Sequence, residues 1–395
     1  MPVDPSALEL PRKTELRDRL IAWCEVNSGS DHPAGLACML TALRDAFRVL
    51  PGRMEEVPLG AGHPQALRVV CRPEAPVQIL LNAHFDTVYG AGHPFQHCEI
   101  VDADRLRGPG VADCKGGILV LLTALQAFEN LPGAKRIGWE VLLGPDEEVG
   151  SHGTAPVYAA TAPRHHCALV FEPARENGDL VRARKATGTF IATCHGRAAH
   201  AARGPAAGRN AILALAEFLL TAARVPDEWP GVMVNVGNIR GGTAANVVPD
   251  FATAEIDARI SLAADAARVE ARLRELAAPI NAREGFRLEL AGGFTRTPME
   301  ATAATEALFA AWQACGRMLE LQFDWQSVGG GSDGNLFAAA GLPVLDGLGP
   351  IGGELHSDRE WIRVSSLVER AHLASLFLAR LNAGEIAPPF RTSRG

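Results

Sequence analysis

The sequence predicts an α/β fold in which a mainly parallel β-sheet is flanked by helices and interrupted by a smaller inserted α+β domain. Three observations support this prediction. Short apolar segments of strand length alternate with helix-length apolar patterns in the first half of the chain. The segment 77–83 is apolar almost throughout, as expected of a strand buried on both faces. From about residue 185 the order becomes strand-helix-strand-strand-helix-strand, which is the ferredoxin-like arrangement.

Chain length agrees with this organisation. A chain of 395 residues is too long for one typical domain, so two are expected. We predict that residues 1–184 and 296–395 together form one domain and that residues 185–295 form the inserted domain.

Apolar residues at helical spacing define the helices of the first domain. Leu36, Met39 and Leu43 recur on one face before Pro51-Gly52 ends the pattern. The predicted helices span 14–26, 36–50, 118–128, 301–315 and 364–381. The predicted strands span 66–71, 77–83, 139–143, 167–171 and 343–345. Residues 327–335 are dense in glycine and are predicted to form a loop.

In the inserted domain, alternating apolar residues predict strands around a Gly241-Gly242 turn. These strands span 187–194, 231–239, 246–260 and 286–290. The two predicted helices span 209–223 and 264–276.

Composition excludes several classes of partner. The net charge of −7 provides no basic field for nucleic acid. No stretch of about 18 uninterrupted apolar residues exists, so no membrane partner is expected. The N-terminal segment has no apolar core of signal-peptide length, and the eight cysteines are dispersed without a Cys-x-x-Cys pair, so a cytoplasmic protein with reduced thiols is expected. Cys98 and Cys114 lie near histidines, but neither has the local signature of a thiol nucleophile.

His84 and Asp86 follow directly after the apolar strand 77–83. Because a strand has a period of two, both side chains can point the same way, so one can bind a metal while the other orients it. The alternative is ordinary turn chemistry, since a lone His-x-Asp is a weak motif.

Four further acidic residues and one histidine stand at similar positions. Asp113 lies in a glycine-rich turn at the start of a buried helix, where an N-cap is the alternative interpretation. Glu147 and Glu148 belong to an acidic run after a buried strand; such a run is either a solvated loop or a set of carboxylates gathered around a cation. Glu172 ends another strand, and His356 follows a glycine loop.

These residue types predict a two-metal hydrolase. His84, Asp113, Glu148, Glu172 and His356 provide two imidazoles and three carboxylates, which suit two Zn²⁺ ions, with Co²⁺ or Mn²⁺ as alternatives. Two such ions polarise a carbonyl and activate a water, and a spare carboxylate then takes the proton of that water. Glu147, beside Glu148, is the candidate for this general base.

Five ordered motifs resemble those of a di-zinc amidohydrolase and peptidase family. The family includes acetylornithine deacetylase, succinyl-diaminopimelate desuccinylase, aminoacylase and glutamate carboxypeptidase (glucarpidase). In chain order the motifs are His-Phe-Asp-Thr-Val from 84, Gly-Pro-Gly-Val-Ala-Asp-Cys-Lys-Gly-Gly from 108, Asp-Glu-Glu-Val-Gly-Ser from 146, Phe-Glu-Pro from 171 and Leu-His-Ser-Asp from 355. The resemblance implies a zinc-peptidase-like fold.

The resemblance assigns a role to each residue of the first domain. It implies that Asp113 bridges two zinc ions, that His84 and Glu172 hold one of them and that Glu148 and His356 hold the other. It also implies that Asp86 orients His84 and that Glu147 is the general acid and base.

The inserted domain resembles the lid and dimerisation domain of the family. The resemblance implies a homodimer in which His200 reaches the partner's site and stabilises the oxyanion. It implies that Asn246 and Arg259 contact the substrate, and an Arg fork is a natural two-point grip for a carboxylate. Arg296 and Gly330 are further substrate-binding candidates; a phosphate loop is disfavoured because the glycine run lacks a Gly-Lys-Ser/Thr ending.

One departure from the family is Cys114, where methionine is usual after the bridging Asp. We interpret it as a small apolar replacement, although a thiol there could also bind metal. The auxin-conjugate hydrolase branch pairs a ligand Cys with a His near this point, and Asp113-Cys114-Lys115 lacks that histidine.

The predicted function is hydrolysis of the amide bond of an N-acyl or N-aminoacyl amino acid, or of a dipeptide-like substrate. Phe-Glu-Pro and Gly-Gly-Gly-Ser-Asp place the chain nearest the glutamate carboxypeptidase branch. A deacylase of the acetylornithine or succinyl-diaminopimelate type is the second enzyme hypothesis. A family member without catalysis is the alternative from another class.

Overall fold

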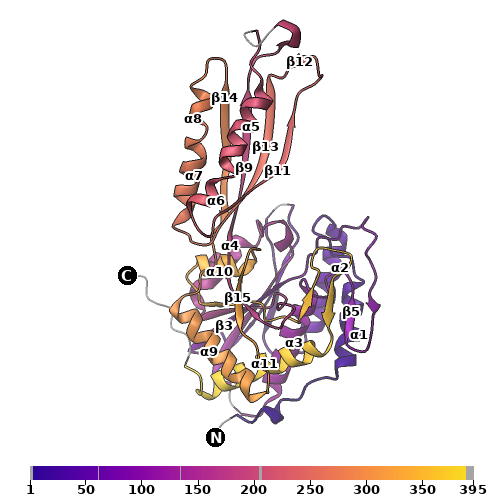
Figure 1. The fold of residues 1–395 in the computed structure, drawn as a ribbon. Coiled ribbons are helices and arrows are strands. Elements are labelled where there is room, and N and C mark those ends of the chain that lie inside the picture. The colour runs from indigo at the N-terminus through magenta and orange to yellow at the C-terminus, as the bar shows by residue number, and fades with distance from the viewer. Residues whose placement is uncertain (1–2, 61, 134, 204–206, 388–395) are drawn as a thin grey trace. The chain divides into compact units, whose positions relative to one another are not determined.

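The chain folds into two compact units, seen in the computed structural model of Figure 1, which describes residues 3–60, 62–133, 135–203 and 207–387. Unit 1 comprises Met1–Arg182, Ala301–Val328 and Ser332–Gly395, and unit 2 comprises Ala183–Glu300 and Gly329–Gly331. The chain therefore leaves and re-enters unit 1. The domain boundaries that the sequence predicts, after residues 184 and 295, remain predictions.

A six-stranded sheet forms the centre of unit 1, in the order β1-β2-β6-β3-β7-β16. These strands are β1 (Arg53–Val57), β2 (Ala66–Cys71), β3 (Val77–His84), β6 (Ile137–Gly144), β7 (Cys167–Val170) and β16 (Val344–Leu345). The four strands β6, β3, β7 and β16 are parallel, whereas β2 runs antiparallel to both β6 and β1. The predicted α/β class with a mainly parallel sheet is confirmed.

Helices cover this sheet. They are α1 (Lys13–Cys24), α2 (Pro33–Phe47), α3 (Lys115–Asn130), α4 (Ala155–Thr161), α9 (Ala303–Met318), α10 (Asp333–Ala339) and α11 (Ser365–Ala383). Nearly every side chain of α3 is buried, because α3 packs between the sheet and both α1 and α11. Burial on all sides explains why this helix lacks a polar face.

Small elements complete unit 1. A second sheet has the order β17-β18-β5-β4, and β15 pairs with β8. These strands are β4 (Glu99–Ile100), β5 (Arg105–Arg107), β8 (Leu180–Arg184), β15 (Trp325–Val328), β17 (Gly352–Gly353) and β18 (Trp361–Arg363). Short 3₁₀ helices are η1 (Pro5–Ala7), η2 (Glu147–Val149) and η3 (Ala162–Arg164).

Unit 2 has the predicted ferredoxin-like order, β9-α5-β11-β13-α7-β14, folded into an antiparallel sheet β11-β13-β9-β14. Its elements are β9 (Ala186–His195), β10 (Ala199–His200), η4 (Ala201–Arg203), α5 (Ala211–Ala222), α6 (Val225–Glu228), β11 (Met233–Gly241), β12 (Val247–Val248), β13 (Phe251–Ile260), α7 (Asp265–Glu275), α8 (Ala278–Asn281) and β14 (Arg287–Arg296). Helix α5 packs on β9 and β13, and α7 packs on β14, around a core that is separate from that of unit 1.

Three details differ from the prediction. The strand predicted at 246–260 is two strands, because Pro249 and Asp250 lie between β12 and β13. Strand β14 continues to Arg296 because it stays paired with β9 past a bulge, so Arg296 lies in unit 2. Residues 333–335, predicted as the end of a loop, instead begin helix α10, since the Ser332 side chain caps the helix and Asn335 completes a capping box.

No helix within the described ranges is long and apolar enough to cross a membrane.

Candidate active site

Three parallel strands end side by side and carry polar residues at their carboxyl ends. His84 is the last residue of β3, Glu147 and Glu148 follow β6, and Glu172 follows β7. Ligands gather at this edge of α/β sheets, because the loops that follow parallel strands open there.

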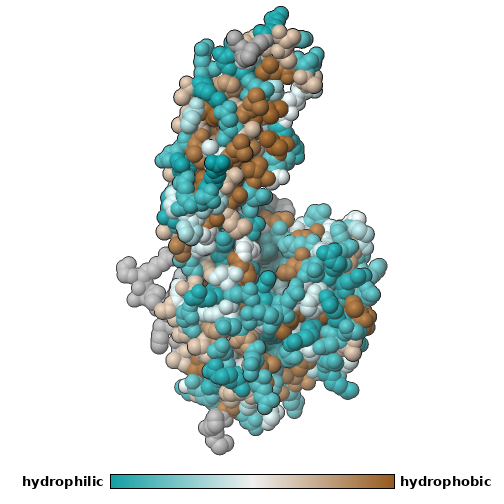
Figure 2. Space-filling view, in the orientation of Figure 1, coloured by the Kyte–Doolittle hydropathy of each residue, from teal (hydrophilic) through white to brown (hydrophobic). Residues whose placement is uncertain are grey.

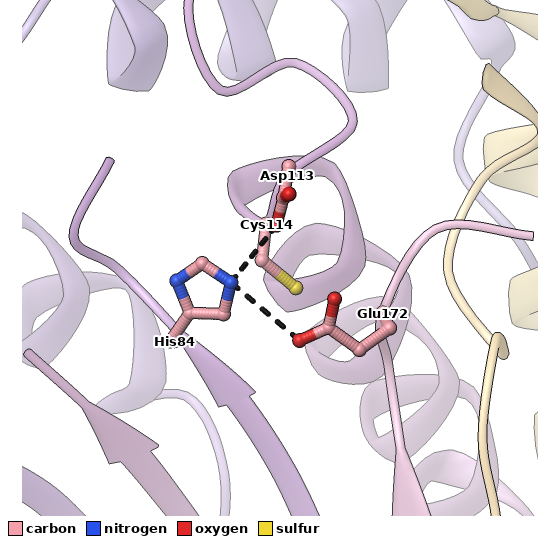
Figure 3. A group of neighbouring side chains, drawn as sticks. All are labelled: His84, Asp113, Cys114 and Glu172. Carbon is pink, nitrogen blue, oxygen red and sulfur yellow. Dashed lines mark hydrogen bonds and ion pairs between the residues drawn. The ribbon is translucent and has the colours of Figure 1, made fainter. Parts of the chain in front are cut away.

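Asp113 reaches the same edge from the turn before α3. Gly117 lets this helix approach β7 closely, since a Cβ there would lie 1.8 Å from the Phe171 carbonyl oxygen. The N-cap of α3 is Cys114, so the Asp113 carboxylate is not the helix cap. Asp113 Oδ1 instead lies 2.9 Å from His84 Nε2, which is also 3.5 Å from Glu172 Oε1 (Figure 3).

The other oxygen of Asp113 faces a second histidine. His356 Nε2 lies 3.3 Å from Asp113 Oδ2 and 3.3 Å from Glu148 Oε2. The two histidines differ in access, because the His84 side chain is 1% exposed and that of His356 is 56% exposed. Asp113 therefore joins one enclosed and one open group of metal-ligand atoms.

Asp86 connects two parts of this arrangement. Its Oδ1 lies 3.2 Å from His84 Nδ1, on the ring edge opposite the Nε2 that faces Asp113. The same carboxylate accepts the backbone N–H of Glu147 at 3.0 Å and that of Glu148 at 3.1 Å, and the Ser30 hydroxyl at 2.8 Å. Asp86 thus contacts both His84 and the main chain of the acidic loop, and the sequence suggested only the first contact.

The electrostatics favour a cation at this place. Burial, and then the Asp113 charge, raises the pKa of Glu148 to about 8. Burial also acts to raise the pKa of Asp113, but hydrogen bonds from His356 and His84 outweigh it and hold that pKa below its usual range. Glu148 Oε1 is buried and has no hydrogen-bond partner among the described residues.

The donor set therefore fits two divalent ions. One group of ligand atoms comes from His84, Asp113, Cys114 and Glu172, and the other from Asp113, Glu148 and His356; within each group all atoms lie within 4.8 Å of one another. Imidazole and carboxylate suit zinc and similar ions.

Cys114 belongs to the enclosed group and is fully buried. Its thiol donates to the Phe171 carbonyl oxygen at 3.1 Å, and burial raises its pKa well above the usual value. A protonated thiol is a poor nucleophile, which disfavours thiol catalysis by Cys114. Figure 3 shows the sulfur beside the Asp113 and Glu172 carboxylates.

The candidates in unit 2 gather at two opposite ends of its sheet. Arg259 and Arg296 both pair with Thr187 at the start of β9, and Arg259 Nη1 donates to the Gly329 carbonyl oxygen at 2.8 Å. The carbonyl oxygen of the next residue, Gly330, accepts a hydrogen bond from Arg184 Nη1 at 3.3 Å.

His200 and Asn246 lie together beyond the other end of β9. His200 pairs with Val247 in the β10–β12 ladder, and the Asn246 carbonyl oxygen accepts from the Ala201 N–H at 3.0 Å. Both residues are exposed. Strand β9 runs from Ala186 to His195, so the two ends are about 30 Å apart at about 3.3 Å per residue.

Nothing in the sequence singles out Ser30 or Glu360, although both contact the site residues. Glu360 is a buried carboxylate whose oxygens accept N–H groups of the Asp113 turn. Its only sequence signal is its place four residues after His356, in a short polar turn that would ordinarily be solvated.

Comparison with known proteins identifies the family. The profile of peptidase family M20/M25/M40 matches residues 80–380, which include every candidate metal ligand. The chain belongs to this peptidase family. It is therefore a metal-dependent hydrolase of amide bonds, as the motifs predicted.

The similar sequences include proteins named as carboxypeptidases and proteins named as desuccinylases. Carboxypeptidase G2 of Pseudomonas sp. (strain RS-16) is 28% identical over 319 residues, covering 78% of this chain and 74% of the relative. Succinyl-diaminopimelate desuccinylase of Paracidovorax citrulli is 28% identical over 383 residues, covering 91% and 92%.

Solved structures show the same fold at lower identity. Aminopeptidase PepT from Bacillus cereus matches with a TM-score of 0.78 at 19% identity, over 94% of this chain and 99% of that one. The YXEP protein of Bacillus subtilis, described as a dinuclear metal-binding peptidase, matches with a TM-score of 0.71 at 16% identity, over 95% and 99%.

Proposed function

We propose that this protein hydrolyses the amide bond between an acyl or aminoacyl group and an amino acid that bears a free carboxylate, using two Zn²⁺ ions. The observation that carries the proposal is the position of Asp113, whose two oxygens face His84 and His356 separately. Each histidine has a second carboxylate nearby, from Glu172 or Glu148.

When bound, the two ions would acidify a water and polarise the scissile carbonyl. Glu147 would take the proton from that water and return it to the leaving amine. Its backbone N–H is fixed by Asp86 and its side chain is only half-buried, so the carboxylate can meet both water and substrate. Asp86 would also hold the His84 ring so that Nε2 faces the ions.

The carboxylate of the substrate is assigned to the arginine end of unit 2. Arg259 and Arg296 flank Thr187 on the two neighbouring strands of β9, so two guanidinium groups stand near one strand start. Gly330 has no side chain, and a substrate there can approach the main chain. Arg259 donates to Gly329, which supports a joint role for the arginine and the glycine loop.

His200 and Asn246 are assigned to the oxyanion and substrate of a partner's site. They lie about 30 Å from the arginine end of the same sheet by strand length, too far for one small substrate to touch both. A homodimer in which unit 2 of each copy supplies His200 to the other copy accounts for this separation.

The surface of unit 2 supports such a dimer. Strand β11 is an edge strand, and exposed apolar residues lie on it and on α5. They are Ile239, Leu213 and Leu220. Figure 2 shows apolar surface over this face of unit 2. Such a patch is typical of a protein–protein contact.

All eight cysteines are free thiols, which supports a reducing, cytoplasmic location.

A deacylase of the succinyl-diaminopimelate type is the second candidate, favoured by the relative that spans 91% of the chain. A substrate panel separates the two hypotheses. Purified protein with its metal content measured is assayed against N-acyl glutamates, glutamate-terminated dipeptides, N-acetylornithine and N-succinyl-diaminopimelate. Preference for C-terminal glutamate supports the carboxypeptidase branch, whereas preference for a succinyl group supports the desuccinylase type. Two bound ions with no hydrolysis of any compound would favour a non-catalytic family member.

A further inference from the structure

Glu360 is a buried carboxylate outside the proposed ligand set, 1% exposed, and directly precedes β18 in unit 1. Its Oε1 accepts the N–H groups of Ala112 at 2.8 Å and Asp113 at 3.0 Å. Its Oε2 accepts the Gly110 N–H at 3.2 Å and lies 2.8 Å from the Tyr89 hydroxyl. The carboxylate therefore grips three N–H groups of the turn that carries Asp113.

The same residue is tied to the loop of His356. The Glu360 N–H donates to the Ser357 carbonyl oxygen at 3.2 Å, and the Tyr89 hydroxyl lies 2.8 Å from that oxygen as well. Ser357 directly follows His356, whose backbone has a φ of +60° and so lies in the left-handed region that non-glycine residues rarely adopt. These hydrogen bonds therefore fix the loop that follows His356, a residue with a strained backbone whose side chain faces Asp113.

Only a carboxylate satisfies all of these donors. An amide of the same shape has one acceptor oxygen, so its NH₂ group would face an N–H that it cannot bind. A buried N–H without an acceptor destabilises the folded protein, and the turn can relieve this cost only by moving. A shift of the turn moves Asp113, the residue shared by both groups of ligand atoms.

We propose that Glu360 is a positioning residue of the metal centre, which sets the distance between the Asp113 turn and the His356 loop. The inference rests on the proposed ligand set. Residues that support metal ligands without touching the ion typically contribute 10–100-fold in metal affinity or activity.

The test compares Glu360→Gln with a matched control in the full-length protein. Zn²⁺ affinity is measured by competition with a chromophoric chelator, and kcat and KM are measured separately. Glu360→Gln is expected to bind Zn²⁺ about 10–100-fold more weakly and to lose kcat by a similar factor, with KM nearly unchanged. Glu140 is the control, because it is also buried, at 2% exposed, but accepts from Arg68 Nε at 2.7 Å within the sheet. Glu140→Gln should lower thermal stability and leave Zn²⁺ affinity unchanged.

Wild-type Zn²⁺ affinity and kcat in Glu360→Gln would overturn the inference, as would an equal loss of affinity in Glu140→Gln. If Glu360→Gln does not fold, Tyr89→Phe replaces it, because this change removes the hydroxyl and keeps the ring contacts with His93 and Phe95. A folded Tyr89→Phe variant should bind Zn²⁺ measurably more weakly than the wild type, and unchanged affinity there would also overturn the inference. Failure of the proposed function is distinct, since the wild-type protein itself would then bind no zinc pair or would hydrolyse no compound of the panel.

Discussion

Replacing Asp86 with Asn should damage both stability and catalysis, although Asp86 is not a proposed metal ligand. The carboxylate is fully buried and accepts the N–H groups of Glu147 and Glu148 with different oxygens. Asn can accept with one oxygen only, so one of these N–H groups would face an NH₂ group. Losing one hydrogen bond to a charged acceptor costs about 1.5–3 kcal/mol, so we expect a loss of about 2 kcal/mol. For a unit of this size, that loss lowers Tm by roughly 3–4 °C.

The catalytic effect follows from the same contact. If the loop shifts by about 1 Å, the Glu147 carboxylate is misplaced and kcat should fall about 100-fold. Calorimetry measures Tm, and steady-state kinetics with the best substrate of the panel measures kcat. Ser30→Ala is the matched control, because it removes one hydrogen bond to the same carboxylate and leaves both contacts with the loop. It should therefore cost a similar amount of stability, about 1.5–3 kcal/mol, and leave kcat nearly unchanged. An Asp86→Asn protein that keeps wild-type Tm and kcat would refute this reasoning.

Three further predictions concern the metal, the dimer and the substrate. Hydrogen bonds to Asp113 and Glu148 raise the pKa of His356 to about 11, so a metal ion must displace that proton. Zn²⁺ binding to the metal-free protein should therefore release protons, and the Zn²⁺ affinity should rise about tenfold per pH unit for each proton released between pH 6 and 9. Calorimetric titration in buffers of different ionisation enthalpy can measure this release. An affinity that does not change with pH would contradict this. The Glu147→Ala and His200→Ala variants should each be inactive. Mixing the two under subunit exchange should restore about a quarter of wild-type activity, because half of the dimers are then mixed and each mixed dimer holds one intact site out of two. No recovery of activity on mixing would rule out a role for His200 in the partner's site. Arg259→Met should raise KM about 10–100-fold for substrates with a free carboxylate and much less for their amides, and an equal effect on both would exclude the carboxylate grip.

Sequence predicts best where one local pattern determines position. His84 and Glu172 end apolar strands, and parallel strands must bring such ends to one edge of the sheet, so their meeting could be expected. The sequence left open whether Asp113 caps a helix or binds a metal. The answer depends on how closely α3 approaches β7, which Gly117 permits and which residue spacing alone does not show.

The missed features depend on contacts between distant segments. Glu360 and Ser30 serve the site through hydrogen bonds to residues far away in the chain, and no periodicity marks such partners. Helix α10 is different, because its start is a local pattern: Ser332 and Asn335 form a capping box. The glycines around this pair favoured a loop prediction instead. Tertiary contacts therefore limit prediction of the supporting residues more than prediction of the ligands.

The metal count per chain tests the central claim most directly. Native mass spectrometry of zinc-loaded protein should find two ions per chain in the wild type and one in Glu172→Ala, because Glu172 belongs only to the enclosed group of ligand atoms. Asp113→Ala should retain neither ion with high affinity, since Asp113 belongs to both groups. Two tightly bound ions in Asp113→Ala, or only one in the wild type, would contradict a two-metal centre shared through Asp113.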